Sequence, residues 1–127
     1  MKAAVPILRS FDEAAAKAFY IDFLGFKILF EHRFGEDAPL YFAVKQGACE
    51  LHLSEHFGDG TPGTFVRIEV EDVADMSAML NAKKFKNAKP GWQRQEWGWD
   101  EMSISDPGGN KLIFASPIPQ DVKKADL

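Results

Sequence analysis

The sequence predicts an α+β fold made of two tandem modules, each with the order strand, helix and three strands. Three observations support this prediction. Segments with helical spacing and segments with strand-like alternation follow one another in this order twice along the chain. A glycine-rich stretch, residues 55–63, separates the two halves. The 127 residues suffice for one core but not for two ordinary domains, so we expect one domain, 1–127, with modules at 1–57 and 64–116.

The first module is expected to begin with a strand over residues 3–9. Pro6 lies within it and favours a position at the sheet edge, because proline lacks the backbone N–H that an inner strand needs. A helix should follow directly. Ser10 and Glu13 have the spacing of a capping box, in which each side chain accepts a hydrogen bond from the backbone N–H of the other residue.

The helix continues through one apolar face and stops at a glycine. Phe11, Ala15, Ala18 and Phe19 recur at helical spacing, and Gly25 can adopt the left-handed conformation that ends a helix. The three further strands of the module are expected at residues 26–31, 40–45 and 49–54.

The second module repeats this order. Residues 64–70 alternate as a strand, and Asp72 can cap the helix after it. The apolar face of that helix comprises Val73, Met76, Met79 and Leu80. The sequence DPGGN at 106–110 is typical of a tight turn. Strands are expected at 85–89, within 95–105 and at 110–116, and a flexible tail at 117–127.

Composition and charge exclude several classes of protein. There are 15 Lys and Arg residues against 19 Asp and Glu residues, a net charge of −4, which disfavours a nucleic-acid partner. Cys49 is the single cysteine, so the chain cannot form an internal disulfide, and we expect it to be a small buried residue. No apolar run reaches the length of a signal peptide or membrane span, so no membrane partner and a cytoplasmic location are expected.

Three motifs make the chain resemble the vicinal oxygen chelate superfamily, which contains glyoxalases, bleomycin resistance proteins and extradiol dioxygenases. They are AxxFYxDxLGF at 16–26, the strand end at 69–73 and DPxGN at 106–110. Residues 5–8 and 96–98 resemble the bleomycin resistance group in particular. The resemblance implies a U-shaped mixed sheet with helices on its outer face, a homodimer, and a small-molecule ligand at the subunit interface.

The resemblance also implies where metal-dependent members hold a divalent ion. The corresponding positions here are Val5, Glu50, Phe65 and Ile113, of which only the glutamate can ligate a metal. We therefore expect no metal and no other cofactor. His52 shares a strand face with Glu50, and His32 and His56 are further possible donors, which we interpret as polar residues of a cleft or its loops.

Aromatic and acidic residues instead predict a ligand-binding cleft. Phe65 and Ile113 would make its base apolar, and three tryptophans lie within residues 92–99, with Trp97 and Trp99 expected on one strand face. By resemblance, Trp97 and Phe34 match ligand-stacking residues. The carboxylates Glu36, Asp37, Glu96, Asp100 and Glu101 would attract a cation. The predicted ligand-binding residues are Phe34, Glu50, His52, Phe65, Arg67, Trp97, Trp99, Glu101 and Ile113.

The function predicted from these residues is binding without catalysis. Cys49 has no identifiable base, and neither a GxSxG motif nor a phosphate loop is present. The chain would sequester a bulky, aromatic, cationic molecule of the bleomycin family at a dimer interface. Two alternatives stay open: a metal-dependent glyoxalase-like lyase or dioxygenase with a rearranged site around Glu50 and His52, and a binding protein for an unknown aromatic or cationic metabolite.

Overall fold

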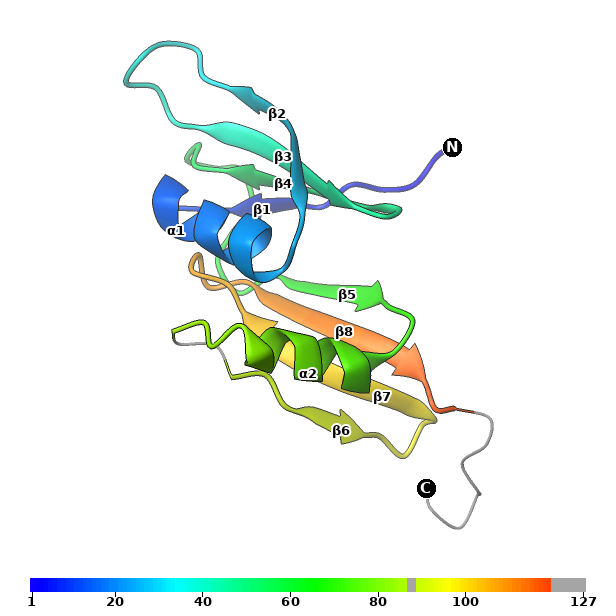
Figure 1. Ribbon diagram of the computed structural model, residues 1–127. Coiled ribbons are helices and arrows are strands. Elements are labelled where there is room, and N and C mark those ends of the chain that lie inside the picture. The colour runs from blue at the N-terminus through cyan, green and yellow to red at the C-terminus, as the bar shows by residue number, and fades with distance from the viewer. Residues whose placement is uncertain (87–88, 120–127) are drawn as a thin grey trace. The chain divides into compact units, whose positions relative to one another are not determined.

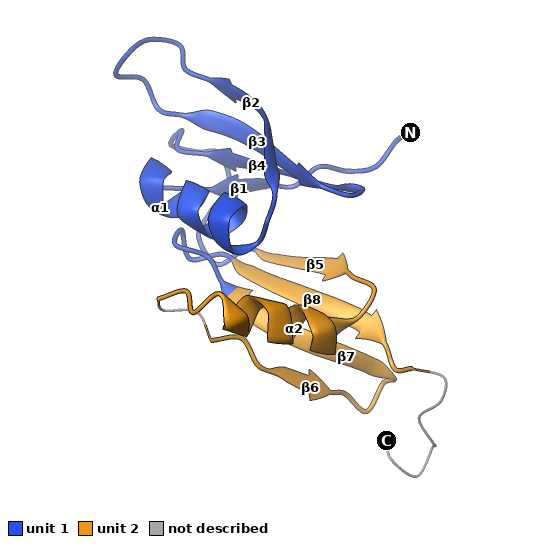
Figure 2. Ribbon diagram, viewed as in Figure 1, with its two compact units in different colours: residues 1–64, 105–110 blue, residues 65–104, 111–127 orange. Residues whose placement is uncertain are grey.

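The computed structural model describes residues 1–86 and 89–119 and divides into two compact units (Figure 1, Figure 2). Unit 1 comprises residues 1–64 and 105–110. The described part of unit 2 comprises residues 65–86, 89–104 and 111–119. Each unit has one four-stranded mixed sheet and helical structure, which confirms the predicted α+β fold with two modules of the same element order.

Unit 1 has the strand order β1-β4-β3-β2, with β1 parallel to β4 and the other pairs antiparallel. Its edge strand β1 is shorter than predicted, and β4 has the predicted bounds. Its elements are β1 (Ile7–Arg9), α1 (Glu13–Lys17), the π-helical segment η1 (Ala18–Phe23), β2 (Lys27–His32), β3 (Tyr41–Gln46) and β4 (Cys49–Ser54).

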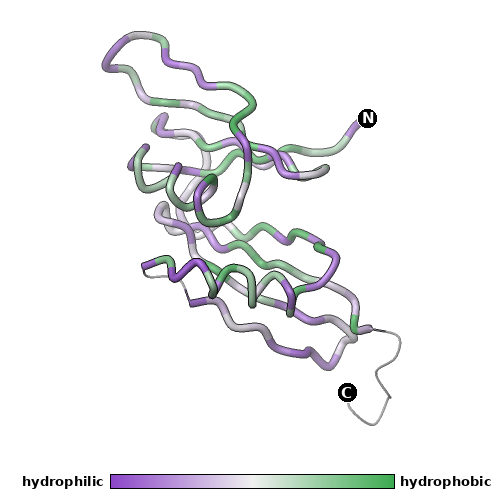
Figure 3. Tube along the Cα trace, viewed as in Figure 1, coloured by the Kyte–Doolittle hydropathy of each residue, from purple (hydrophilic) through white to green (hydrophobic). Residues whose placement is uncertain are grey.

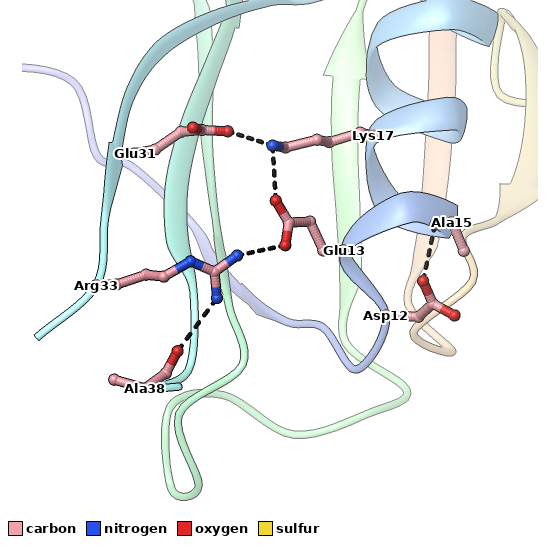
Figure 4. Close-up of polar contacts among 7 residues, drawn as sticks. All are labelled: Asp12, Glu13, Ala15, Lys17, Glu31, Arg33 and Ala38. Atoms are coloured by element: carbon pink, nitrogen blue, oxygen red, sulfur yellow. Dashed lines mark hydrogen bonds and ion pairs between the residues drawn. The ribbon is translucent and has the colours of Figure 1, made fainter. Parts of the chain in front are cut away.

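The predicted capping box at the start of α1 is wrong, because Asp12 caps this helix in place of Ser10. The Asp12 side chain accepts a hydrogen bond of 3.0 Å from the backbone N–H of Ala15 (Figure 4). Ser10 is buried, and its backbone N–H continues the β1–β4 pairing by donating to the Ser54 carbonyl at 2.8 Å. Phe11 thus lies outside the helix and is exposed, so it does not belong to the apolar helix face.

The helical segment of unit 1 packs against one face of its sheet. Gly25 ends it with a φ of +86°, as predicted. The helical core residues are Ala16, Phe19, Tyr20 and Phe23, and the sheet contributes Leu8, Phe42, Val44, Leu51 and Leu53. Side chains alternate along each strand, so Ile7, Tyr41, Glu50 and His52 lie on the opposite face, which we call the open face of unit 1.

Unit 2 has the strand order β5-β8-β7-β6, with β5 parallel to β8 and β6 antiparallel to β7. The helix α2 lies over one face of this sheet (Figure 1). We call the other face, which carries Phe65, Arg67 and Glu101, the open face of unit 2. The elements are β5 (Phe65–Glu69), α2 (Val73–Ala82), β6 (Trp92–Arg94), β7 (Trp99–Ser105) and β8 (Lys111–Pro117).

The helix α2 begins as predicted, with the Asp72 side chain accepting a hydrogen bond of 3.0 Å from the Asp75 N–H. Its buried face consists of Val73, Ser77 and Leu80, whereas Met79 is exposed, contrary to the prediction. Among the described residues, no helix is long and apolar enough to cross a membrane.

Two predicted segments reach into the residues that are not described. Of the strand predicted at 85–89, residues 87–88 lie outside the described part, and Phe85, Lys86 and Lys89 do not belong to a strand. Of the tail predicted at 117–127, residues 120–127 lie outside it, and Pro117 is the last residue of β8.

Candidate functional site

A hydrogen-bonded chain of three side chains crosses the open face of unit 1. The Tyr41 hydroxyl lies 2.5 Å from Nδ1 of His52, and Nε2 of the same imidazole lies 2.7 Å from a carboxylate oxygen of Glu50. The antiparallel pairing of β3 with β4 brings these side chains together, because Tyr41 pairs with Ser54, and Ala43 pairs with His52. Both ring nitrogens of His52 therefore have partners, and phenol, imidazole and carboxylate form one continuous path.

Apolar and acidic groups surround this chain. The Phe30 ring lies parallel to the Tyr41 ring at 6.3 Å and meets the His52 ring edge-on at 5.5 Å. The pKa of Tyr41 lies above its usual value, mainly because the phenol is partly buried and further because the carboxylates of Asp59 and Glu50 disfavour a phenolate. The phenol is therefore neutral at pH 7, and the negative field here favours cations.

Phe34 lies in a separate aromatic group of unit 1. Its ring is 82% exposed and meets the ring of His32 at 4.4 Å and that of His56 at 5.9 Å, both edge-on. The two histidines flank this exposed ring, away from the hydrogen-bonded pair of Glu50 and His52. An exposed ring of this kind can stack on a flat ligand.

The side chains at the four positions expected to hold a divalent metal do not provide enough ligands for one. Glu50 and His52 supply two donors, and Val5, Phe65 and Ile113 supply none. Within residues 1–86 and 89–119, no three His, Cys, Asp or Glu side chains lie close enough to hold a metal ion. These side chains therefore do not form a divalent metal site of that kind.

Four of the predicted ligand-binding residues meet on the open face of unit 2. One oxygen of Glu101 lies 2.9 Å from the indole nitrogen of Trp97 and 2.9 Å from Nη1 of Arg67. The guanidinium of Arg67 also lies over the Trp99 ring, 5.2 Å from its centroid. A carboxylate, a cation and two indoles thus form one connected group.

The route by which the two indoles meet differs from the prediction. Trp97 precedes β7, and Gly98 has a φ of +92°, so the period-two alternation does not reach from Trp99 back to Trp97. Glu101 joins them, because it accepts from Trp97 and pairs with the arginine that covers Trp99. Trp97 remains 64% exposed.

A second ring on this face also lies next to a cation. Phe65 is 65% exposed, and the ammonium of Lys111, its partner in the β5–β8 register, lies 5.0 Å from the ring centroid. The same register places Ile113 beside Arg67.

Four residues differ from what the sequence predicts. Tyr41 and Lys111 were missed, because the only signal for them is their strand register, which no local pattern reveals. Asp100 does not contribute an accessible negative charge, because it is buried and forms two hydrogen bonds with Arg94, of 2.9 and 3.1 Å. Cys49 is only partly buried, and burial raises the pKa of its thiol.

Comparisons with known proteins identify the fold. Residues 1–120 match the family described as glyoxalase superfamily protein. A bleomycin resistance determinant encoded on the transposon Tn5 is 22% identical, covers 92% of this chain and 98% of its own, and superposes with a TM-score of 0.71. A bleomycin-binding protein complexed with bleomycin is 23% identical, with 91% and 98% coverage and a TM-score of 0.68.

An enzyme is among the similar structures as well. A lactoylglutathione lyase from Agrobacterium tumefaciens is 18% identical, covers 91% of this chain and 94% of its own, and has a TM-score of 0.69. No curated protein sequence matches the chain. At these identities the structural comparisons establish the fold, and the residues of the site must decide the function.

Proposed function

Because this chain belongs to the glyoxalase superfamily, we propose that it is a non-catalytic binding protein of the bleomycin-resistance type. Its ligand is a bulky molecule that combines flat aromatic rings with a cationic group, as the bleomycin family does. The protein sequesters this ligand and performs no chemistry on it, so that affinity alone is required of the site.

The observation that carries this proposal is the exposed ring of Trp97 beside a carboxylate. The indole is held in place by its hydrogen bond to Glu101, while most of the ring surface remains accessible. A fixed, exposed ring suits stacking on a flat ligand, and the neighbouring carboxylate suits a cation. A bleomycin-binding protein of the same fold supports the assignment of ligand class.

Titration with bleomycin, followed by tryptophan fluorescence, tests the proposal. We expect saturable quenching at about one ligand per subunit, and Trp97→Phe should weaken binding by about tenfold, because it removes the larger ring and its hydrogen bond. Trp92→Phe is the matched control and should bind as the parent chain does. A flat titration with bleomycin and phleomycin would sink the drug assignment, and native mass spectrometry of freshly purified protein would then identify a co-purified metabolite.

We also propose that the ligand lies at the interface of a homodimer. The edge strand β2 supports a dimer, because it contains a hydrophobic stretch (Figure 3). In this strand Ile28, Leu29 and Phe30 each expose more than two-fifths of their surface. Apolar side chains in a row on an edge strand are typical of an association surface.

An enzyme is the second candidate, and the chain of Tyr41, His52 and Glu50 favours it. A phenol, an imidazole and a carboxylate in hydrogen-bonded sequence can move a proton between a ligand and solvent. Elemental analysis of protein purified without chelators tests a metal-dependent lyase or dioxygenase at Glu50 and His52. A stoichiometric metal that Glu50→Gln and His52→Gln both abolish would favour the enzyme, and its absence together with bleomycin binding would favour sequestration.

A further inference from the structure

We propose that Trp99 and Glu101 form a binding site for a planar cation, a guanidinium or amidinium group, and that the chain's own Arg67 occupies this site. The inference rests on the proposed function, because it names the cationic group that the ligand presents to unit 2. It adds that the ligand must displace an arginine of the protein to bind there.

The site already holds a planar cation, the guanidinium of Arg67, against an aromatic ring and a carboxylate. The Arg67 guanidinium lies over the Trp99 ring at 5.2 Å, within the range of a cation–π interaction. Its Nη1 lies 2.9 Å from Glu101, which also fixes the indole of Trp97. One aromatic face and one carboxylate therefore receive the cation, and a second indole lies beside them.

The exposure of the arginine and the glutamate indicates which of the two can move. The side chain of Arg67 is 46% exposed, whereas that of Glu101 is 12% exposed. Arginine has a long, flexible stem that can carry its head group into solvent, while the glutamate is held between two donors. When a ligand displaces the guanidinium, Trp99 and Glu101 remain as a preformed site.

A second arginine of unit 2 has similar partners but is more buried and more fully hydrogen-bonded, and it serves as a comparison for Arg67. Arg94 lies over the Trp92 ring at 5.8 Å and pairs with Asp100. That pair has two hydrogen bonds, and the side chains are 28% and 6% exposed. Arg67 has the same kinds of partner but a single ion pair and more exposure, which suits a cation that can be exchanged.

The other charged residues on the open face of unit 2 determine from which end a cationic ligand approaches the site. Lys111 pairs with Phe65 at one end of the β5–β8 register, and Glu69 pairs with Ala115 at the other. A second cation is repelled at the lysine end and attracted at the glutamate end. The cationic group of the ligand should therefore approach from the Glu69 end, with its flat rings on the exposed surface of Trp97.

Removing the arginine and supplying a small cation in its place tests the inference. In Arg67→Ala, we expect benzamidine to bind about tenfold more tightly than to the parent chain, measured by isothermal titration calorimetry. Benzamide, which has the same ring and shape without the charge, should gain nothing. Lys27→Ala, which removes an exposed cation of unit 1, is the control for net charge and should leave benzamidine binding unchanged.

Two further variants exclude trivial explanations. Arg67→Thr also removes the cation and leaves the Trp99 ring uncovered, and threonine favours a strand more than alanine does, so this variant should also bind benzamidine more tightly and guards against poor folding of Arg67→Ala. Adding Glu101→Gln to either variant should abolish the gain. Equal binding of benzamidine and benzamide to both arginine variants would overturn the inference, as would unchanged benzamidine affinity in both.

The test of the cation site and the test of the proposed function can fail independently of each other. Bleomycin binding to the parent chain tests the function, and benzamidine binding to the arginine variants tests the cation site. If bleomycin binds but benzamidine shows no gain, the function stands and the cation site is wrong. If benzamidine gains affinity but bleomycin does not bind, the site stands and its natural ligand is another planar cation.

Discussion

Asp106 is the residue on which the DPGGN turn depends. Its carboxylate accepts hydrogen bonds from the Tyr20 hydroxyl, the backbone N–H groups of Gly108 and Asn110, and the Asn110 side chain. The same Asn110 amide donates to the carbonyl of Arg9. A motif that the sequence marks as a turn therefore also joins β1 and the helical segment of unit 1.

Gly108→Ala should destabilise the protein by about 1–3 kcal/mol, because the new methyl group needs space that the turn does not have. A Cβ at this position would lie 2.5 Å from the Arg9 carbonyl oxygen, which is fixed by the hydrogen bond from Asn110. Chemical denaturation measures the loss. Gly35→Ala is the control, since nothing lies within 4 Å of its Cβ, and an equal loss there would contradict this explanation.

The pKa values of both tyrosines should lie above the usual value of about 10 in the folded protein. Burial and the carboxylate of Asp106 raise the pKa of Tyr20, and burial with Asp59 and Glu50 raises that of Tyr41. The pKa of each tyrosine is higher in the folded protein than the value of about 10 in the unfolded chain. The contribution of these two groups to the free energy of unfolding is therefore complete below pH 10 and is lost as the pH rises through the folded pKa. Absorbance at about 295 nm should show that tyrosinate forms at higher pH in the folded protein than in the denatured chain. A lower midpoint of the tyrosine titration in folded Asp59→Asn than in the parent chain would support the role of that carboxylate.

Local sequence signals predicted most of the helices and strands, but they do not reveal which residues of different elements contact one another. The bounds of β4 and the Asp72 cap follow from alternation and capping chemistry, which act within a few residues. The predicted start of α1 was wrong, because the backbone N–H of Ser10 donates to the carbonyl of Ser54 in the sheet, and this partner lies far along the chain. Tyr41 escaped the site prediction for the same reason, since register alone brings it to His52.

Charged side chains tie α1 to the hairpin of β2 and β3. Glu13 pairs with Lys17 and Arg33, and Lys17 also pairs with Glu31 (Figure 4). Arg33 further donates to the Ala38 carbonyl in the hairpin loop at 3.1 Å. These contacts hold the strand that precedes Phe34 against the helix.

Glu13→Gln should lower stability by up to about 1 kcal/mol at pH 7, because the partners are partly exposed and solvent screens them. Hydrogen bonds from Lys17 and then Arg33 hold the pKa of Glu13 below its usual 4.5. The contribution is therefore complete above that value and is lost as the pH falls through the lowered pKa. Denaturation of both proteins at pH 7 and at about pH 3 should show the difference vanishing in acid. Glu36→Gln is the control in the same unit, and a difference that persists in acid would exclude the ion pairs as its cause.

At the scale of the whole molecule, the two repeated halves do not correspond to two independent pieces of chain. Residues 105–110, which are the last residue of β7 and the turn that leads to β8, cluster with unit 1. Their contacts with Arg9 and Tyr20 explain why. Repetition of element order is visible in the sequence, whereas this exchange of one turn depends on contacts between residues about a hundred positions apart in the chain.

The proposed homodimer requires that the exposed apolar side chains of β2 be covered by a second copy. Light scattering should then give about 28 kDa, twice the 14.2 kDa of one chain. Leu29→Glu places a charge within the apolar row and should give the monomer mass, because a buried, unpaired carboxylate costs several kcal/mol. Phe57→Glu changes a fully exposed ring of the same unit outside β2 and should leave the dimer intact. If the dimer persists in Leu29→Glu but is lost in Phe57→Glu, the interface lies at the loop after β4 and not at β2. If the parent chain has the mass of a monomer, a ligand site shared between subunits is excluded.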